Sequence, residues 1–378
     1  MKLLVFTPYY PPHMGGLETH SAEWNAALSR LGYTITVITP HLPSDTPSQE
    51  QTTWGEIIRY PAFEIVSGYP LPKFWLPAFW SICHKICQKQ NRPGTVITRT
   101  RFFFSSFLGF LYAKVFRIPL IHIEHGSDYV KLSSSLTTFL AYLYDQTLGS
   151  LLFRYSHQNI AISQAVALFI QRFDKRNTPI IYRGLDFAEI ESVTPTPKKT
   201  NKTVVTTAAR LYAWKGIGNT LEALRLLSPQ DLASLEFHII GDGEDMNTLQ
   251  EKALGLPVIF HGAQPRQVVM SHLKSSDIFI HSSYPGGGLS TSLLEALACS
   301  NATIATPYEG ANEIIIHKQN GFLLTDSDPQ EIAEALTNLL HDAALRGRLA
   351  VQGKETVYRQ FNWQESANRY HTLLTSSH

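Results

Sequence analysis

The stretch Ile278–Ala296, IFIHSSYPGGGLSTSLLEA, contains the clearest change from one kind of local structure to another in this chain. The run Ile278–His281 predicts a strand, the three glycines after it predict a loop, and a helix is expected over Thr291–Ala298. Short strands that are apolar on consecutive positions are typical of parallel sheets buried on both faces. The segment therefore predicts an α/β fold in which a loop at the carboxyl end of a strand leads into a helix.

The same alternation extends over the whole sequence. Further candidate strands are Leu3–Thr7, Thr34–Thr39, Thr95–Thr98, Leu120–Ile123, Asn159–Ile162, Val204–Ala208, Glu236–Ile240, Val258–Phe260 and Ala302–Thr306. Further candidate helices are Leu17–Leu31, Gln164–Phe173, Asn219–Leu227 and Gln330–Leu340. Strands and helices in this order predict doubly wound parallel sheets of the Rossmann-like kind.

The chain has 378 residues, which is too long for one ordinary core and predicts two domains. The polar, proline-bearing run TPTPKKTNK, residues 194–202, interrupts the series and is typical of a linker. We therefore expect an N-terminal domain over residues 1–192, a linker over 193–202 and a C-terminal domain over 203–360. A helix within residues 361–378 is expected to pack back on the first domain.

Composition excludes several classes of protein. Lys and Arg number 32 against 31 Asp and Glu, a net charge of +1, which argues against a nucleic-acid-binding chain. The cysteines, Cys83, Cys87 and Cys299, form no disulfide framework and suit the reducing cytoplasm, where we expect the protein. No window of about 18 uncharged apolar residues predicts a transmembrane helix.

Residues 65–123 contain no acidic residue and are rich in aromatic rings. The basic residues of this span are Lys73, Lys85, Lys89, Arg92, Arg99, Arg101, Lys114 and Arg117. Basic charge interleaved with Trp and Phe is typical of a face that meets an anionic membrane. This favours a peripheral protein at the inner face of the membrane; the alternative is that the aromatic rings fill the core of the first domain.

The loop and helix start after Ile278–His281 predict a phosphate-binding site, since free N–H groups at a helix start attract anions. The residues concerned are Gly288, Leu289, Ser290, Thr291, Ser292 and Leu293. Glu295 lies about one turn into the helix, where a carboxylate can accept hydrogen bonds from both hydroxyls of a ribose. Its apolar neighbours indicate a buried Glu that needs a partner, which favours a ligand over a solvated surface position.

Other candidate site residues follow other strands. Arg210 and Lys215 lie after Val204–Ala208, where two cations suit a diphosphate, although a solvated loop would look the same. Gly241 and Gly243 follow Glu236–Ile240 and form a weak signal, since most Gly-Asp-Gly triplets are turns. His125 follows Leu120–Ile123 and is a candidate to point toward a ligand.

The N-terminal loop Pro11–His20 contains Gly15 and Gly16 but no GxGxxG or GxxxxGK[ST] pattern, which disfavours a dehydrogenase and a P-loop enzyme. Taken in order along the chain, these motifs resemble the retaining family 4 glycosyltransferases of GT-B fold. The resemblance implies two Rossmann-like domains that face a central cleft. It implies a hydroxyl acceptor, a glycolipid or cell-surface polysaccharide precursor, and no cofactor or metal besides a UDP- or GDP-linked sugar donor.

The resemblance also implies roles for single residues. Arg210 and Lys215 would hold the donor diphosphate, Glu295 the ribose, and His125 the donor sugar, while Gly16 would approach the reacting centre. Thr291 and Ser292 would offer N–H groups to phosphate, and Leu293 and Leu294 would lie near the ribose.

The sequence departs from the family pattern at Gly287, where the family has a Glu that touches the donor sugar. An unusual donor, a substitute carboxylate such as Glu309 or Asp128, or loss of activity would each follow from that change. A non-catalytic GT-B protein that binds a nucleotide sugar or a partner is therefore the main competing hypothesis. A nucleotide-sugar epimerase is a further alternative.

Overall fold

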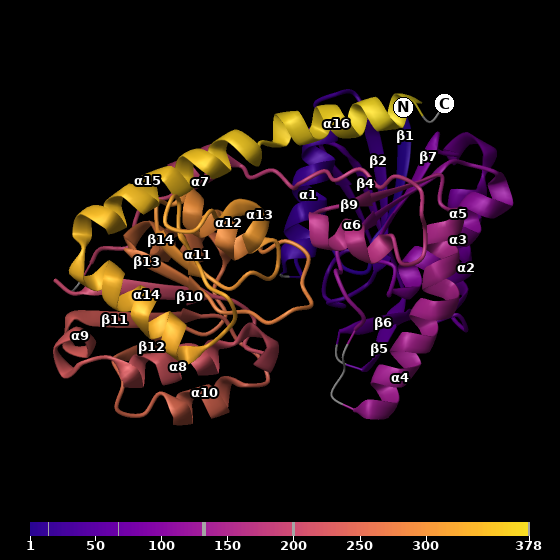
Figure 1. Ribbon diagram of the computed structural model, residues 1–378. Helices are drawn as coiled ribbons and strands as arrows, with labels where there is room; N and C mark the ends of the chain where they lie inside the picture. The colour runs from indigo at the N-terminus through magenta and orange to yellow at the C-terminus, as the bar shows by residue number, and fades with distance from the viewer. Residues whose placement is uncertain (14, 67, 131–133, 199–200, 377–378) are drawn as a thin grey trace. The chain divides into compact units, whose positions relative to one another are not determined.

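A computed structural model describes residues 1–13, 15–66, 68–130, 134–198 and 201–376. The chain divides into two compact units, Met1–Gly184 with Trp363–His378, and Leu185–Asn362 (Figure 1). The first crossing between units thus precedes the linker that we expected over residues 193–202. Parts of our predicted segments lie outside the described residues: Met14, Ser67, Lys199, Thr200, Ser377 and His378.

Among the described residues, seven strands of the first unit form one sheet in the order β3-β4-β2-β1-β7-β8-β9. Their bounds are β1 Lys2–Phe6, β2 Thr34–Pro40, β3 Gln49–Thr52, β4 Gly55–Tyr60, β7 Thr95–Arg99, β8 Leu120–Glu124 and β9 Gln158–Ala161. All neighbours pair in parallel except β3 with β4. A separate antiparallel hairpin joins β5, Ala62–Val66, to β6, Tyr69–Pro72.

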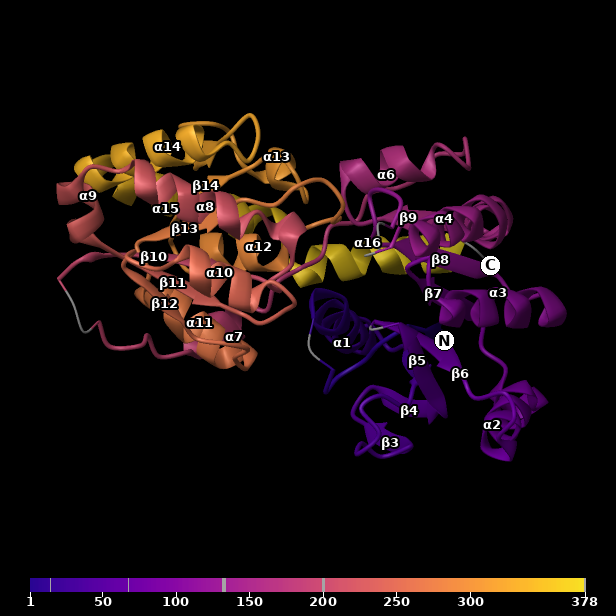
Figure 2. The same ribbon diagram turned by 90° about the horizontal axis from the view of Figure 1, so that it is seen from below.

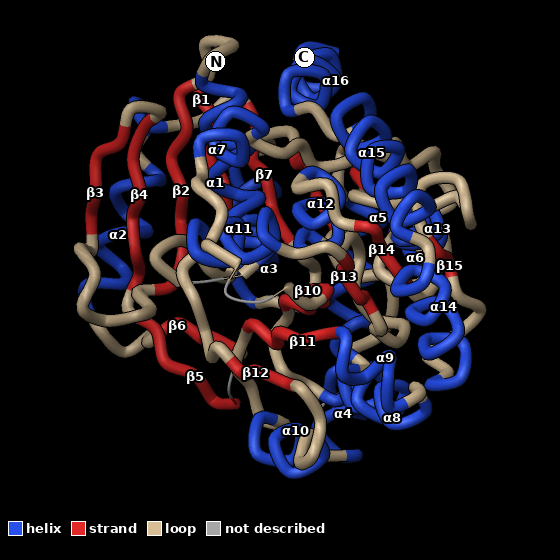
Figure 3. The backbone as a smooth tube through the Cα atoms, turned by 90° about the vertical axis from the view of Figure 1, so that its left-hand side faces the viewer, coloured by secondary structure: helices blue, strands red, loops and turns tan. Residues whose placement is uncertain are grey.

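The antiparallel strand β3 departs from the purely parallel sheet that the sequence predicts. Its four residues are mostly exposed and polar, so the apolar pattern of a buried strand is missing. Figure 3 shows β3, β4 and β2 as neighbouring strands, with β3 at the edge of the sheet. Short polar edge strands of this kind protect a sheet from pairing with other chains.

Helices cover both faces of this first sheet. On one face α2, α3 and α5 share an apolar core with the strands, through side chains such as Phe79, Tyr112 and Leu152. Elsewhere α1 packs on α16, where Trp24 meets Tyr370 edge to face. The helical bounds are α1 Gly16–Ser29, α2 Pro77–Cys87, η1 Lys89–Asn91, α3 Phe104–Phe116, α4 Ser135–Tyr144, η2 Asp145–Gly149, α5 Ser150–Tyr155, α6 Gln164–Ile170 and α16 Trp363–Ser376.

The second unit contains a sheet in the order β12-β11-β10-β13-β14-β15, parallel throughout its described pairs. Its strands are β10 Thr203–Ala208, β11 Leu235–Ile240, β12 Val258–Phe260, β13 Ile278–His281, β14 Ala302–Ala305 and β15 Phe322–Leu323. Its helices are α7 Phe187–Ser192, η3 Ala213–Lys215, α8 Ile217–Leu226, α9 Pro229–Ser234, α10 Met246–Lys252, α11 Arg266–Ser275, α12 Thr291–Ala298, α13 Ala311–Ile314, α14 Pro329–His341 and α15 Ala343–Gln360.

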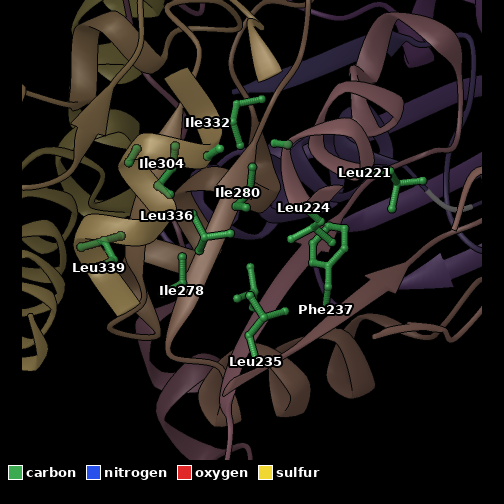
Figure 4. Packing of buried hydrophobic residues seen from close by; sticks show 14 of the residues in the cluster. Leu221, Leu224, Leu235, Phe237, Ile278, Ile280, Ile304, Ile332, Leu336 and Leu339 are labelled. Carbon is green, nitrogen blue, oxygen red and sulfur yellow. The ribbon is translucent and has the colours of Figure 1, made fainter. Parts of the chain in front are cut away.

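One face of this second sheet packs on α8, α10 and α14. Phe237 and Ile280 of the strands meet Leu221, Leu224 and Leu336 of these helices in a fully buried cluster (Figure 4). Figures 1 and 2 show α11 on the opposite side of β11 and β12 from α10. Burial on both faces explains why these strands are apolar at consecutive positions.

All ten predicted strands and all six predicted helices are present, with shifts of one to three residues at many ends. The elements that the sequence pattern did not predict include α3, α4 and the two antiparallel hairpins. The α/β fold with doubly wound parallel sheets in two units is confirmed.

Two glycines provide a test of the packing. A Cβ on Gly184 would meet the backbone of Trp363, whose Cα would lie 2.5 Å away, so Gly184→Ala should destabilise the first unit by about 2–3 kcal/mol. Gly347 lies within α15 with nothing near its would-be Cβ, so Gly347→Ala should stabilise its helix by up to about 1 kcal/mol. Urea unfolding of both variants measures the two effects, and equal effects would contradict the described packing.

Candidate active site

An ion pair lies at the carboxyl edge of the second sheet. The ammonium of Lys215, in the loop after β10, donates to both carboxylate oxygens of Glu309, in the loop after β14, at 2.8 Å each. The side chains are 13% and 6% exposed, respectively. A largely buried pair with this bidentate geometry fixes the two loops to each other.

Glu309 is held in an unusual environment. Burial acts to raise the pKa of its carboxyl, but the Lys215 ammonium, His281 and the hydrogen bonds to the carboxylate together outweigh burial, and the net result is a pKa below the usual value. His281 Nε2, at the end of β13, lies 3.3 Å from Glu309 Oε2, and burial lowers the pKa of this imidazole to about 4. Glu309 also has a positive φ of 50°, a conformation that is uncommon for a non-glycine residue.

Gly287 lies directly against the Glu309 side chain. A Cβ built on Gly287 would lie 2.7 Å from both Cγ and Cδ of Glu309, so any side chain here would displace that carboxylate. Residue 287, where we expected a carboxylate, therefore lies beside the carboxylate of Glu309, which comes from the loop after β14. The other candidate substitute, Asp128, belongs to the first unit, where its side chain lies 3.6 Å from Arg172.

Backbone contacts tie the loop that contains Glu309 to the start of α12. Ser290 N donates to Glu309 O at 2.9 Å, and the Ser290 hydroxyl caps the helix by accepting from Leu293 N. On the other side, Ser282 Oγ donates to Lys215 O at 3.1 Å, and Gly216 leaves no room for a Cβ beside Ser282 O. The predicted phosphate loop and the cation after β10 are thus brought together by Glu309 and Ser282.

The segment Gly288–Leu293 has the geometry that the sequence predicts. It leads from the loop into α12, whose first turn contains Thr291 and Ser292, and the hydroxyls of Ser290 and Ser292 lie 3.4 Å apart. Leu289 packs beneath the next loop, since its side chain lies where a Cβ of Gly310 would be. A helix start that is capped by a Ser hydroxyl can accept an anion at its remaining N–H groups.

Glu295 is buried, but the structure corrects the argument that its burial points to a ligand. The Arg266 guanidinium of α11 donates through Nε to Glu295 Oε1 at 3.0 Å, and its Nη1 donates to Glu189 Oε2 at 2.7 Å. The partner that a buried carboxylate needs is therefore supplied by the protein itself.

Arg210 differs from Lys215 in being exposed. Its guanidinium lies 5.5 Å from the centre of the Tyr212 ring, and no ion pair joins it to any residue that the structure describes.

The glycines after β11 have a packing explanation, because Cβ atoms on Gly241 and Gly243 would strike the backbone of Ala209 and Leu211. These glycines bring the loop after β11 against the loop that contains Arg210.

His125 follows β8 in the first unit and is half-buried, with its Nε2 shielded from solvent. Burial lowers the pKa of its imidazole to about 3, with a further contribution from the Arg99 charge, so the ring is neutral at pH 7. Its Nε2 has no hydrogen-bond partner among the described residues. Its backbone N–H donates to Glu124, a carboxylate that burial would make less acidic but that Arg101 holds at a depressed pKa.

His20 of α1 lies beside His125, with ring centres 4.9 Å apart. Arg99 Nη1 lies 2.9 Å from His20 Nδ1, which indicates that Arg99 donates to an unprotonated nitrogen. Gly16 begins α1, the helix that carries His20. Arg183 donates to Glu23 Oε2 at 2.7 Å and so anchors the end of the first unit to α1.

The basic surface that we expected over residues 65–123 is only partly present. Arg99 and Arg101 are buried, Arg101 between Glu124 and Asp145, so neither contributes to a surface. Phe79 is in the core as well. Trp75 and Trp80 remain exposed at 67% and 59%.

Comparison with known proteins places the whole chain among enzymes of one kind. The chain is 39% identical to an uncharacterized glycosyltransferase of Methanocaldococcus jannaschii, MJ1069, over 99% of this chain and 98% of that protein. The family described as Glycosyltransferase Family 4 matches residues 14–189, and Glycosyl transferases group 1 matches residues 189–356. The chain belongs to glycosyltransferase family 4.

Other relatives of this glycosyltransferase act in polysaccharide synthesis. It is 26% identical to TuaC, a putative teichuronic acid biosynthesis glycosyltransferase of Bacillus subtilis, over 98% of this chain and 97% of that one. Sucrose-phosphate synthase from Thermosynechococcus elongatus superposes with a TM-score of 0.81 at 18% identity, covering 99% and 98% of the two chains. Anabaena HepE in complex with UDP-glucose superposes with a TM-score of 0.75 at 19% identity, and the match covers 100% of both chains. These structural similarities establish the GT-B fold.

The sequence analysis missed two features of this glycosyltransferase, the partner of Glu295 and the exposed apolar face of α4. Arg266 lies far from Glu295 in sequence, and no local pattern relates them. The exposed apolar stripe of α4 did have a signal, the helical spacing of Leu136, Phe139, Leu140 and Leu143.

None of the helices in the described segments is long and apolar enough to span a bilayer.

Proposed function

We propose that this glycosyltransferase moves a sugar from a nucleotide-diphosphate donor to a hydroxyl acceptor with retention of configuration. The observation that carries the proposal is the group of Lys215, Glu309 and the capped start of α12 at one edge of the second sheet. In open α/β sheets, ligands bind at the carboxyl ends of strands, and anions bind at helix starts.

The diphosphate would be held by Arg210, Lys215 and the N–H groups of Thr291 and Ser292. Arg210 is exposed and not engaged in an ion pair with a described residue, so it can meet a phosphate without breaking a contact of that kind. Charge develops on the diphosphate as it leaves, and fixed cations stabilise it in the transition state. With these groups in place, the reaction needs no metal ion.

Glu309 is our candidate for the carboxylate that binds the hydroxyls of the donor sugar. It fills the space beside Gly287, the position at which the resemblance places that carboxylate. Lys215 keeps it ionised, so it can only accept hydrogen bonds, as sugar hydroxyls require. Glu295, fixed by Arg266, would accept from the ribose.

Retention would follow if the acceptor hydroxyl attacked the anomeric carbon on the face that the diphosphate leaves. The bond from the anomeric carbon to the leaving oxygen breaks, the bond to the acceptor oxygen forms, and the leaving phosphate takes the acceptor proton. His125 would contact the donor sugar as a neutral imidazole, and the loop at Gly16 would approach the acceptor. UDP- or GDP-linked sugars are the expected donors, and HepE binds UDP-glucose.

The competing hypothesis is a non-catalytic protein that binds a nucleotide sugar or a partner. Gly287 was its main support, and the carboxylate of Glu309 beside Gly287 weakens that support. Turnover decides between the two hypotheses, since both predict that a nucleotide binds.

We also propose that the acceptor lies at an anionic membrane surface, as a glycolipid or polysaccharide precursor would. In α4, Leu136, Phe139 and Leu140 are 67%, 61% and 54% exposed and lie on one helical face with Leu143. Exposed Lys and Arg side chains of the same unit, Lys89, Arg92, Lys114 and Arg117, would attract anionic lipid. An apolar helical face supported by basic charge is typical of an interfacial helix.

Transfer and hydrolysis assays with a panel of UDP-, GDP-, ADP- and TDP-sugars test the function. We expect turnover with at least one donor, and Arg210→Ala should lower it about 100-fold by removing one charge-stabilising group. Arg359→Ala, another exposed Arg of the second unit, should leave the rate unchanged. Binding of a nucleotide without turnover across the panel would favour the non-catalytic hypothesis.

The role of Glu309 predicts a pattern in three variants. Glu309→Gly should lose most transfer activity because the sugar hydroxyls lose their acceptor, and Gly287→Glu alone should lose it because two side chains compete for one space. The double variant, with Gly287→Glu and Glu309→Gly, should recover transfer above either single variant. Rates are measured at saturating donor with melting temperatures as the control for folding, and a double variant no better than Glu309→Gly would contradict the role.

Vesicle flotation tests the membrane surface. The protein should float with vesicles that contain anionic lipid at low salt, and Phe139→Glu with Leu140→Glu should abolish this by placing charge on the apolar face. Leu254→Glu, a change at a 73% exposed Leu in the second unit, is the matched control and should still float. Equal flotation of all variants would exclude α4 as the contact.

A further inference from the structure

Three histidines of the second unit gather away from the Lys215–Glu309 pair. His238 lies within β11, His261 follows β12, and His272 lies in α11. One ring nitrogen from each lies within 4.8 Å of the others. Three separate elements of the fold thus converge on one point between the sheet and α11.

We propose that His238, His261 and His272 form a binding site for a divalent transition metal ion of the zinc type, with water completing the coordination. Neutral imidazole is a preferred ligand of such ions. The site would be structural, joining α11 to the edge of the sheet, and it stands independently of the proposed function.

The distances support this assignment. His261 Nε2 and His238 Nδ1 are 3.1 Å apart, and the ring centres of His261 and His272 are 4.4 Å apart. Two nitrogens that bind one tetrahedral zinc at ~2.1 Å lie about 3.4 Å from each other. The His261–His238 pair is already near this spacing, and the nitrogen of His272, which lies within 4.8 Å of the other two, reaches it by side-chain rotation.

The carboxylate of Glu236 lies beside the ring of His238. Glu236 is two residues before His238 on the same strand face, and its Oε2 is 3.6 Å from His238 Nε2. His238 Nε2 is buried and has no hydrogen-bond partner among the described residues. A ring that binds metal through Nδ1 commonly donates its Nε2–H to a carboxylate in this position, which orients the ring and fixes its tautomer.

A metal here would hold α11 in place. Apart from His272, α11 contains Arg266, which pairs with Glu295 and Glu189, and Lys274, which donates to the carbonyls of Glu191 and Val193. Because α11 meets several segments of the second unit, fixing it to β11 stabilises more than one contact.

Zinc titration of the full chain, prepared without a histidine tag and stripped with a chelator, tests the site. Cys83 and Cys87 lie one turn apart in α2 and could also bind zinc, so every protein is made with both changed to Ser. We expect one zinc per chain by calorimetry and a melting temperature several degrees higher with equimolar zinc. Both effects should be absent after His261→Ala with His272→Ala.

Two further variants sharpen the result. His341→Ala, at a 64% exposed His of the same unit, should bind zinc like the parent protein. Glu236→Gln should weaken binding about 10–100-fold if the carboxylate orients His238. Zinc binding of equal strength in the double His variant, or no zinc binding by the parent protein, would overturn the proposal.

Discussion

The ion pair between Lys215 and Glu309 organises the carboxyl edge of the second sheet. It joins the loops after β10 and β14, and through Ser290 it reaches the start of α12. Removing one partner of a buried pair leaves the other charge uncompensated, at a cost of about 3–5 kcal/mol. The loops that would receive a donor are therefore positioned by the same charges that would contact it, and a strained backbone at Glu309 is tolerated in return.

The first unit buries its charges in a similar way. Arg101 lies between Glu124 and Asp145, at 3.3 Å and 2.9 Å, and Glu124 also accepts the backbone N–H groups of His125 and Gly126. Burial raises the pKa of Asp145 to about 6, even though Arg101 opposes this. In both units a buried carboxylate with a basic partner fixes a loop at the carboxyl edge of the sheet, which keeps candidate site residues in one conformation.

The fold could be predicted from the sequence because parallel strands buried on both faces have an unmistakable apolar pattern, and the glycine loop before Thr291 marks the start of a helix. The edge strand β3 could not, since QEQT has neither apolar alternation nor burial. The sequence could predict that candidate site residues lie together where they adjoin neighbouring strand ends, as at Lys215 and Ser290. The proximity of Gly287 to Glu309, and of Arg266 to Glu295, depends on how separate loops and helices pack, which no local pattern reports.

The space shared by Gly287 and Glu309 also constrains how these positions can evolve. A side chain at residue 287 has no room while Glu309 is present, so a carboxylate cannot move to that position in one mutational step. Glycine at residue 309 would first relieve the positive φ and open the space, at the cost of an intermediate with no carboxylate at all. The order of substitutions, and not only their identity, is thus dictated by a contact between two loops.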